Sequence, residues 1–221
     1  MGGYVRSGSI YTGLLHNKEK KQKQSSKKER YVKVNFKSKK EWNELRGLIR
    51  ELSYEKRNVT LASGRQSDFY IDTKQTSLNS RGALLIGTIL TEVISSEFKD
   101  AIAAGGITMG ADPLATATSV ISDMKGTPIH AFYIRKEPKG HGTGQWVEGT
   151  KNIPSGSKVV ILEDVVTTGG STLKSCDRAK EYGLNILGII SIVDREEGGR
   201  ETIEAQGYKF MSLFTKTEIV Q

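Results

Sequence analysis

"VVILEDVVTTGGST", Val159 to Thr172, joins an apolar run to two adjacent acids and then to a series of small residues. Its first half has the aliphatic content and length of a strand buried on both faces of a parallel sheet. Its second half, Thr167 to Thr172, has the glycines and hydroxyls of a tight turn that opens a helix. Backbone N–H groups in such a turn, next to the positive end of a helix, attract an anion. The stretch therefore predicts a strand, a phosphate-binding turn and a helix.

The two acids, Glu163 and Asp164, stand directly before this turn. Carboxylates at that place suit the hydroxyl groups of a sugar, or a cation bound beside the phosphate. The turn lacks the lysine of the G-x-x-x-x-G-K-[ST] motif, which favours a monophosphate held by neutral donors over a nucleoside triphosphate. A helix cap with a Gly-Gly turn is the plain structural alternative, but it gives no role to the acids.

Strands and helices alternate along the rest of the chain. Ser38 and Glu41 fit a capping box, and apolar residues at helical spacing follow as far as Leu52. Residues 58–72 predict two short strands around a Ser-Gly turn. Further strands are predicted at 101–106, 129–136, 158–164, 185–195 and 209–215, and helices at 82–94, 111–124 and 171–183. This order favours an α/β fold with a central parallel sheet flanked by helices, in which ligands bind beyond the carboxyl ends of the strands.

The net charge of +8 belongs to one end of the chain. Residues 1–40 hold 12 Lys and Arg against 2 Asp and Glu, whereas residues 41–221 hold 21 against 23. We predict a disordered basic extension over residues 1–37 and one folded domain over residues 38–221. A solubilising extension is the plain interpretation of the basic segment, and an arm that binds nucleic acid is the alternative.

The sequence indicates neither a membrane nor a secreted location. No apolar run approaches the ~18 residues of a membrane span, and the N-terminus lacks the apolar region of a secretory signal. The single cysteine, Cys176, allows no internal disulfide and fits a reducing compartment. We therefore expect a cytoplasmic protein with no membrane partner.

Two further loops carry polar or glycine residues unlike those of a plain connection. The segment Arg135 to Gly144, "RKEPKGHGTG", places basic side chains among glycines, which suits a loop that rearranges over a pyrophosphate. A solvated loop with incidental charge is its alternative. The segment Gly105 to Ala115, "GGITMGADPLA", is a second glycine-rich turn between a strand and a helix, and a helix cap by Asp112-Pro113 is its alternative.

Together these motifs resemble the type I phosphoribosyltransferase family, and within it the orotate phosphoribosyltransferases. The resemblance spans roughly residues 40–215 and includes "LASGRQSDFYIDTKQT", Leu61 to Thr76. It implies the type I phosphoribosyltransferase fold, with a small N-terminal hood formed by about residues 55–78 and the C-terminal strand. Some family members carry lysine where this chain has Ala62 and Met109, so the contacts made by those lysines are not expected here.

The resemblance also implies which residues bind 5-phosphoribosyl 1-pyrophosphate (PRPP). The expected set is Arg135, Lys136, Lys139, His141, Glu163, Asp164, Val165, Val166, Thr167, Thr168, Gly169, Gly170 and Ser171. Among them the acids face the ribose and the turn holds the 5-phosphate. We expect catalysis from Lys139, His141, Arg135 and Asp164, with Lys139 as the main electrostatic catalyst. The cofactor implied is Mg²⁺, bound mainly through PRPP, with Asp164 as its candidate protein ligand.

For orotate, the resemblance implies contacts from Tyr70, Ile71, Lys74, Thr167 and Arg195. By residue type alone, Tyr70 can stack on a flat base and Arg195 can pair with a carboxylate. An ordinary strand aromatic and an ion pair of Arg195 with Glu196 or Glu197 on the surface are the plain alternatives.

The function expected is transfer of a phosphoribosyl group from PRPP to orotate in pyrimidine synthesis. The resemblance implies a homodimer in which the Arg135–Gly144 loop serves the neighbouring subunit. A separate chain would then supply orotidylate decarboxylase. Two other functions remain open: a purine-type phosphoribosyltransferase, against which Arg195 argues, and a nucleic-acid-binding regulator, which only the basic extension supports.

Overall fold

The computed structural model describes residues 39–60, 66–138 and 145–221, and residues 35–221 form one compact unit. The predicted basic extension and the capping-box serine, Ser38, lie outside the described residues. So do Ala62, Lys139 and His141.

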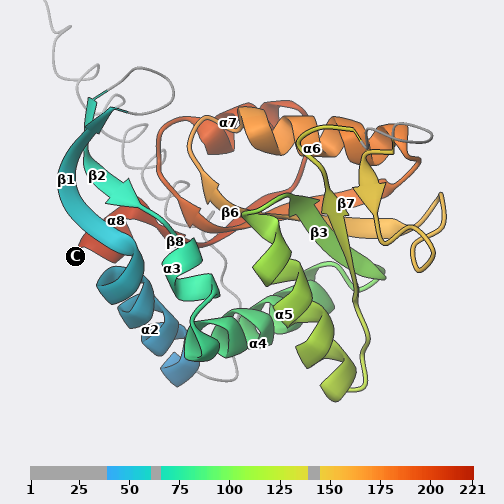
Figure 1. Cartoon of the computed structure of the whole chain (residues 1–221), viewed down its shortest axis with the longest axis horizontal. Helices are drawn as coiled ribbons and strands as arrows, with labels where there is room; N and C mark the ends of the chain where they lie inside the picture. The colour runs from blue at the N-terminus through green and yellow to red at the C-terminus, as the bar shows by residue number, and fades with distance from the viewer. Residues whose placement is uncertain (1–38, 61–65, 139–144) are drawn as a thin grey trace, which may run out of the picture. The chain divides into compact units, whose positions relative to one another are not determined.

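A six-stranded sheet forms the centre of the unit (Figure 1). Its strands follow the order β5-β4-β3-β6-β7-β8, and all neighbouring pairs are parallel except β4 and β5. The bounds are β3 Ala103–Ile107, β4 His130–Ile134, β5 Val147–Glu148, β6 Lys158–Val166, β7 Asn185–Asp194 and β8 Phe210–Thr215. The predicted parallel sheet is therefore confirmed. The first part of the opening stretch, Val159 to Val166, lies on β6, one of the two central strands, and its end begins α6.

Helices cover both faces of the sheet (Figure 1). Helices α6 (Gly170–Glu181) and α7 (Gly199–Ala205) lie on one face, and α4 (Ser80–Glu97) and α5 (Ala111–Met124) lie on the other, with α2 (Lys39–Leu48) packed against α4. Asn79 caps α4, since its side chain accepts hydrogen bonds from the backbone N–H groups of Arg81 and Gly82. Gly183 ends α6 with φ +97°, a conformation that favours glycine.

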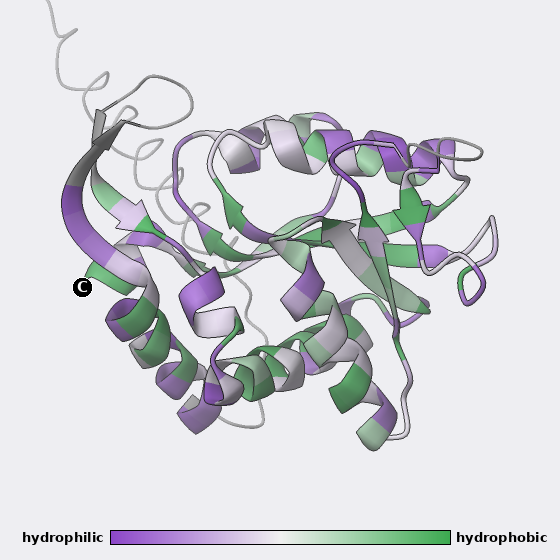
Figure 2. Ribbon diagram, in the orientation of Figure 1, coloured by the Kyte–Doolittle hydropathy of each residue, from purple (hydrophilic) through white to green (hydrophobic). Residues whose placement is uncertain are grey.

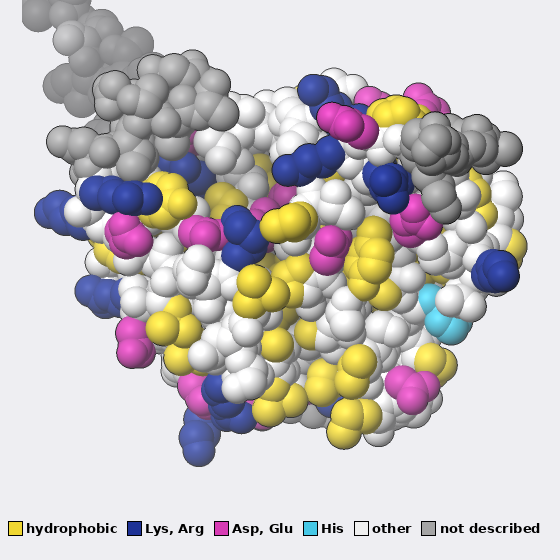
Figure 3. Space-filling model, in the orientation of Figure 1, with side chains coloured by type: hydrophobic (Ala, Val, Ile, Leu, Met, Phe, Trp, Pro, Cys, Tyr) yellow, Lys and Arg dark blue, Asp and Glu magenta, His cyan; other side chains and the backbone are white. Residues whose placement is uncertain are grey.

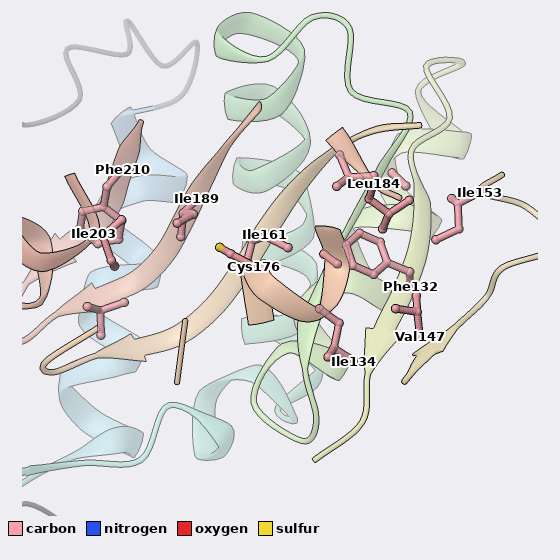
Figure 4. Close-up of a cluster of buried hydrophobic side chains, with 14 residues drawn as sticks. Phe132, Ile134, Val147, Ile153, Ile161, Cys176, Leu184, Ile189, Ile203 and Phe210 are labelled. Atoms are coloured by element: carbon pink, nitrogen blue, oxygen red, sulfur yellow. The ribbon is translucent and has the colours of Figure 1, made fainter. Parts of the chain in front are cut away.

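A cluster of buried apolar side chains fills the space between the sheet and α6 (Figure 4). Phe132 and Ile161 come from the strands, and Cys176 comes from α6. Figure 2 shows strands β6, β7 and β8 as largely hydrophobic, as expected for strands buried on both faces. Cys176 is fully buried in this cluster, and its burial raises the pKa of the thiol to about 12.

A two-stranded antiparallel hairpin, β1 (Tyr54–Thr60) and β2 (Gln66–Ile71), forms the hood. The rings of Tyr54 and Phe69 stack at a centroid distance of 5.2 Å. Strand β1 starts four residues earlier than predicted, directly after a π-helical turn, η1 (Ile49–Ser53), that ends the first helix. The last predicted strand was expected to join the hood. Instead it is β8, at the edge of the main sheet, and among the described residues the hairpin consists of β1 and β2.

Four short elements were not predicted from the sequence. They are β5, α3 (Lys74–Ser77), α7 and α8 (Lys216–Val220). Each is too short for a periodic pattern to develop. None of the helices in the described part of the chain combines the length and the apolar content that crossing a bilayer requires.

Candidate functional site

The two acids at the end of β6 are neighbours that contact different elements. Glu163 is 4% exposed and accepts hydrogen bonds from Oγ1 of Thr172 at 3.0 Å and Oγ of Ser171 at 3.4 Å. Asp164 is partly exposed and accepts one from Oγ1 of Thr73 at 3.1 Å. Glu163 therefore contacts the start of α6, whereas Asp164 faces the base of the hood.

The surroundings of Glu163 change its ionisation. Burial raises its pKa from 4.5 to about 8, and the neighbouring charge of Asp164 adds to the effect. Of the two adjacent carboxyls, Glu163 is therefore the one whose neutral form is favoured by its surroundings.

The turn between β6 and α6 is open on one side and closed on the other. The first N–H groups of a helix lack intrahelical partners. No side chain caps α6, so these N–H groups are not used by a cap, and the N-cap residue Gly169 has φ +84°. Thr168, Gly170 and Ser171 are exposed, and a Cβ added to Gly170 would meet nothing within 4 Å. This open side has the geometry of the predicted anion site.

Gly199, the first residue of α7, closes the other side of the turn. A Cβ at Gly199 would lie 2.5 Å from Cγ1 of Val166 and 2.7 Å from the carbonyl oxygen of Thr167. The turn therefore rests on a glycine that the sequence analysis missed. Val166 is buried and Val165 partly exposed, so Val166 offers only its backbone to a ligand.

The second glycine-rich turn, between β3 and α5, meets Asp164 from the other face. A Cβ on Gly110 would lie 2.6 Å from Oδ1 of Asp164. Gly110 is also the N-cap residue of α5, and Asp112 lies inside the first turn, so the alternative of a cap by Asp112-Pro113 is wrong. Met109, in the same turn, is 66% exposed.

The basic loop begins where β4 ends. Arg135 forms an ion pair with Glu148 on β5 at 3.1 Å, and its backbone N–H donates to the carbonyl of Trp146 at 2.9 Å. Lys136 is exposed. Of the four basic residues predicted here, only these two belong to the described residues.

Four of the five predicted orotate residues, Tyr70, Ile71, Lys74 and Arg195, lie in or next to the hood. Arg195 is 6% exposed; its Nη2 donates to the carbonyl of Phe69 at 3.2 Å and pairs with Glu197 at 2.9 Å. The alternative, an ion pair of Arg195 with Glu197, is thus present. The Arg195 side chain in this pair is buried, however, and it is also hydrogen-bonded to Phe69 on the hood strand β2.

Tyr70 directly precedes Ile71, the last residue of β2, and Lys74 follows three residues later, at the start of α3. The guanidinium of Arg57 lies 3.9 Å from the centroid of the Tyr70 ring. A hydrogen bond to the Asp72 carboxylate raises the pKa of Lys74, and the charges of Asp72 and Asp164 raise it further. The positive charge of Lys74 therefore lies near Asp164, the partly exposed acid of β6.

The structure brings the turn after β6, Asp164 and the base of the hood to one edge of the sheet. Thr73, Gly110 and Gly199 complete this arrangement and were missed. The glycine-rich composition of Gly105 to Ala115 was a signal for Gly110, whereas nothing near Thr73 in the sequence marks it.

Among the described residues, no group of three or more His, Cys, Asp or Glu side chains is placed to hold a metal ion. The carboxylate of Asp164 is partly exposed at the site, which fits an ion whose other ligands come from a phosphorylated substrate.

One family model and several known proteins match the chain. The model of the phosphoribosyl transferase domain matches residues 76–211. An orotate phosphoribosyltransferase of Nostoc sp. is 46% identical over 174 residues, which cover 79% of this chain and 82% of that protein.

Two solved structures of Mycobacterium tuberculosis orotate phosphoribosyltransferase each cover 82% of this chain and 99% of their own. The complex with Fe(III) dicitrate has 36% identity and a TM-score of 0.71, and the complex with PRPP has 34% and 0.68. These matches confirm the resemblance that the sequence motifs indicated.

Proposed function

The chain belongs to the orotate phosphoribosyltransferase family, and from this premise we propose that it transfers the phosphoribosyl group of PRPP to orotate. The products are orotidine 5′-monophosphate and pyrophosphate, in the de novo synthesis of UMP. The observation that carries the proposal is the edge formed by Asp164 and the open turn Thr167–Ser171, with Lys74, the first residue of α3, near Asp164.

In this proposal the 5-phosphate binds the N–H groups and hydroxyls of Thr167 to Ser171. The open space in front of Gly170 supports a close approach of the phosphate. The ribose hydroxyls lie against the acidic pair, and Asp164 makes the stronger contact because its carboxylate is the more exposed of the two. Glu163 keeps Ser171 and Thr172 in place from behind.

Orotate lies under the hood, with Tyr70 and Ile71 beside its ring and Thr167 and Lys74 at its polar edge. Its carboxylate pairs with Arg195. The burial of Arg195 and its attachment to Phe69 support this role, since a preorganised guanidinium binds a carboxylate at little cost in side-chain entropy.

Catalysis in this proposal rests on stabilising negative charge as pyrophosphate leaves an oxocarbenium-like ribose. Arg135 and Lys136 hold the pyrophosphate, Lys139 is the main electrostatic catalyst, and His141 supplies a proton or a hydrogen bond. Lys139→Ala is expected to lose about 10²–10³ in kcat while PRPP still binds. Near-normal turnover of Lys139→Ala would refute its role.

Mg²⁺ is proposed as the cofactor. Asp164 would hold the ion together with PRPP, and the ion would supply positive charge to stabilise the pyrophosphate.

We also propose a homodimer whose subunits share their catalytic loops. An open groove of about 640 Å³ supports it, lined mostly by apolar side chains of α3, α4 and α5 (Figure 3). Leu78, Leu84 and Val120 line the groove and are exposed in the single chain, and Met109 extends it to the site. Such a patch is typical of a protein interface, and a second copy that covers it lies next to the catalytic edge.

Two measurements test the dimer. Val120→Glu is expected to give monomers in sedimentation velocity, whereas Ile102→Glu, at an exposed apolar residue outside the groove, leaves dimers intact. Monomeric wild-type protein would contradict the proposal. Mixed dimers of Lys139→Ala and Asp164→Asn chains should regain activity, and confirmed mixed dimers without recovery would exclude shared loops.

The turnover assay decides among the functions. Loss of the ultraviolet absorbance of orotate in the presence of PRPP and Mg²⁺ is the expected result. Turnover of a purine base in place of orotate would favour the purine-type alternative. No turnover with either base would refute the proposal that the protein is a phosphoribosyltransferase. A cytoplasmic location is part of the proposal, supported by the free buried thiol of Cys176.

A further inference from the structure

The turn between β7 and α7 carries Arg195, the residue proposed to pair with the orotate carboxylate. Asp194, which ends β7, is 1% exposed, and its Oδ2 accepts a hydrogen bond from Nε of Arg200 on α7 at 3.1 Å. The backbone N–H of Arg195 donates to the carbonyl of Val166 on β6 at 2.9 Å. These two contacts fix the chain up to Arg195.

Glu196 fixes the chain directly after Arg195. Its backbone N–H donates to Oδ1 of Asp194 at 2.9 Å. Its exposed side chain reaches helix α8, where Oε2 accepts hydrogen bonds from the N–H of Thr217 at 2.9 Å and from Oγ1 of Thr217 at 2.5 Å. Arg195 therefore lies between two neighbours, one of which is bonded to α7 and the other to α8.

The backbone of Glu196 has an unfavourable conformation. Its φ is +58°, and within residues 39–60, 66–138 and 145–221 every other residue with a positive φ is a glycine. Glycine adopts such a conformation readily, whereas an L-residue adopts it at a cost in free energy. A strained conformation persists where the surrounding contacts determine it. The two hydrogen bonds from Thr217 are contacts of this kind, and they hold the turn in its observed form.

Helix α8 is a firm support for this contact. Thr215 and Glu218 form a capping box at its start, because each side chain accepts a hydrogen bond from the backbone N–H of the other residue. Ile219 is fully buried, and the helix packs against β8 and η1. A contact with α8 therefore joins the turn to the main sheet.

We propose that Glu196 is a positioning residue, which holds the Arg195 guanidinium in the place where it pairs with the orotate carboxylate. The proposal rests on the role proposed above for Arg195. The guanidinium also donates to the carbonyl of Phe69 in the hood. Since Arg195, Phe69 and α8 belong to one chain, this support acts within one subunit.

The contacts of Glu196 also predict which substrate its loss affects. They include neither the turn after β6, which is proposed to hold the 5-phosphate, nor the basic loop after β4. The loss of the Glu196 side chain should therefore weaken the binding of orotate and leave the binding of PRPP unchanged.

Glu196→Gly separates the fold of the turn from the position of Arg195. Glycine accepts a φ of +58° without strain but offers no carboxylate to Thr217. We expect a melting temperature close to that of the wild type and an unchanged KM for PRPP. The KM for orotate should rise about three- to tenfold, the equilibrium factor of one lost hydrogen bond. A wild-type KM for orotate, or an equal rise in both KM values, would overturn the proposal.

Two further variants supply a rescue and a control. Glu196→Gln keeps a side-chain oxygen that can accept from Thr217, so it should keep most of the affinity for orotate. Glu201→Gln removes the same charge from an exposed position on α7 and should leave both KM values unchanged. If Glu196→Gln raises the KM for orotate as much as Glu196→Gly does, or if Glu201→Gln also raises it, charge is responsible and the proposal fails.

Thr217→Val tests the partner on α8. It removes the Oγ1 donor, but the backbone N–H still donates to Glu196, so the rise in the KM for orotate should be smaller than in Glu196→Gly. In the Glu196→Gly background, Thr217→Val should add no further rise, because its partner is already absent. Independent effects of the two substitutions would overturn the link through α8. Failure of the proposed function would appear separately, as a wild-type protein that does not consume orotate.

Discussion

The two sides of strand β6 treat its terminal acids differently. On the α6 side, Glu163 is buried, which raises its pKa, and it is bonded to the hydroxyls of Ser171 and Thr172. On the α5 side, Asp164 is partly exposed and meets Thr73 and Gly110. Two adjacent carboxylates can therefore have different roles. Glu163 supports the phosphate turn, and Asp164 faces the proposed substrate.

Among the variants that test the surroundings of the two acids, Gly110→Ala should have the largest effect on activity. The new Cβ would lie 2.6 Å from Oδ1 of Asp164, and the end of a side chain can move away at little cost in stability. We expect turnover to fall about 10²-fold, as when a catalytic contact is misplaced, with a melting temperature close to that of the wild type. A normal kcat, or a loss of activity explained by unfolding, would contradict the proposed role of Asp164 at the site.

Gly199→Ala tests the opposite side. Its Cβ would meet Val166 and the backbone at Thr167, which cannot move without shifting the phosphate turn. We expect a loss of about 1–3 kcal/mol in the free energy of unfolding and a higher KM for PRPP. Gly47→Ala, on α2 with nothing within 4 Å of the new Cβ, is the matched control and should cost nothing. A stable Gly199→Ala protein with normal KM would contradict the packing argument.

Thr73→Val removes the hydroxyl that donates to Asp164 and keeps the shape of the side chain. A lost hydrogen bond to a charged group is worth about 1.5–3 kcal/mol, so we expect kcat/KM to fall about 10-fold or more. Thr73→Ser restores the donor and should recover most of the activity. Equal activities of the valine and serine variants would show that the hydrogen bond has no role.

Glu163→Gln should have the smallest effect, and it appears in the pH dependence of stability. Because the folded-state pKa of Glu163 is raised to about 8 from 4.5, the folded chain holds a proton that the unfolded chain releases between these values. The free energy of unfolding therefore falls as pH rises from about 5 to 8. Glutamine cannot titrate, so the melting temperature of Glu163→Gln should fall less over this range. Identical slopes for the two proteins would refute the raised pKa.

The parallel sheet was predictable from the sequence because strands buried on both faces are continuous apolar runs, as in Val159 to Leu162. The phosphate turn was predictable because glycine and hydroxyl residues cluster there. The different surroundings of the acids were not: the partner of Asp164, Thr73, lies 91 residues away in the chain. Only the alternation of side chains along a strand could have separated Glu163 from Asp164 in advance.

Glu196 illustrates the same limit. In sequence it is one of two acids that follow Arg195, and its contact with Thr217 spans 21 residues. Lys139 and His141 lie outside the described residues, so their roles stay predictions.

The most direct test of the divided acids is the affinity for PRPP, with Mg²⁺, measured by titration calorimetry at pH 7 for Asp164→Asn and Glu163→Gln. We predict that Asp164→Asn weakens binding by at least about 10-fold, through one lost charged hydrogen bond. Glu163→Gln should change the affinity by less than about threefold, because Glu163 is buried behind the turn and glutamine can still accept hydrogen bonds from Ser171 and Thr172. Equal losses, or a larger loss in Glu163→Gln, would contradict this prediction.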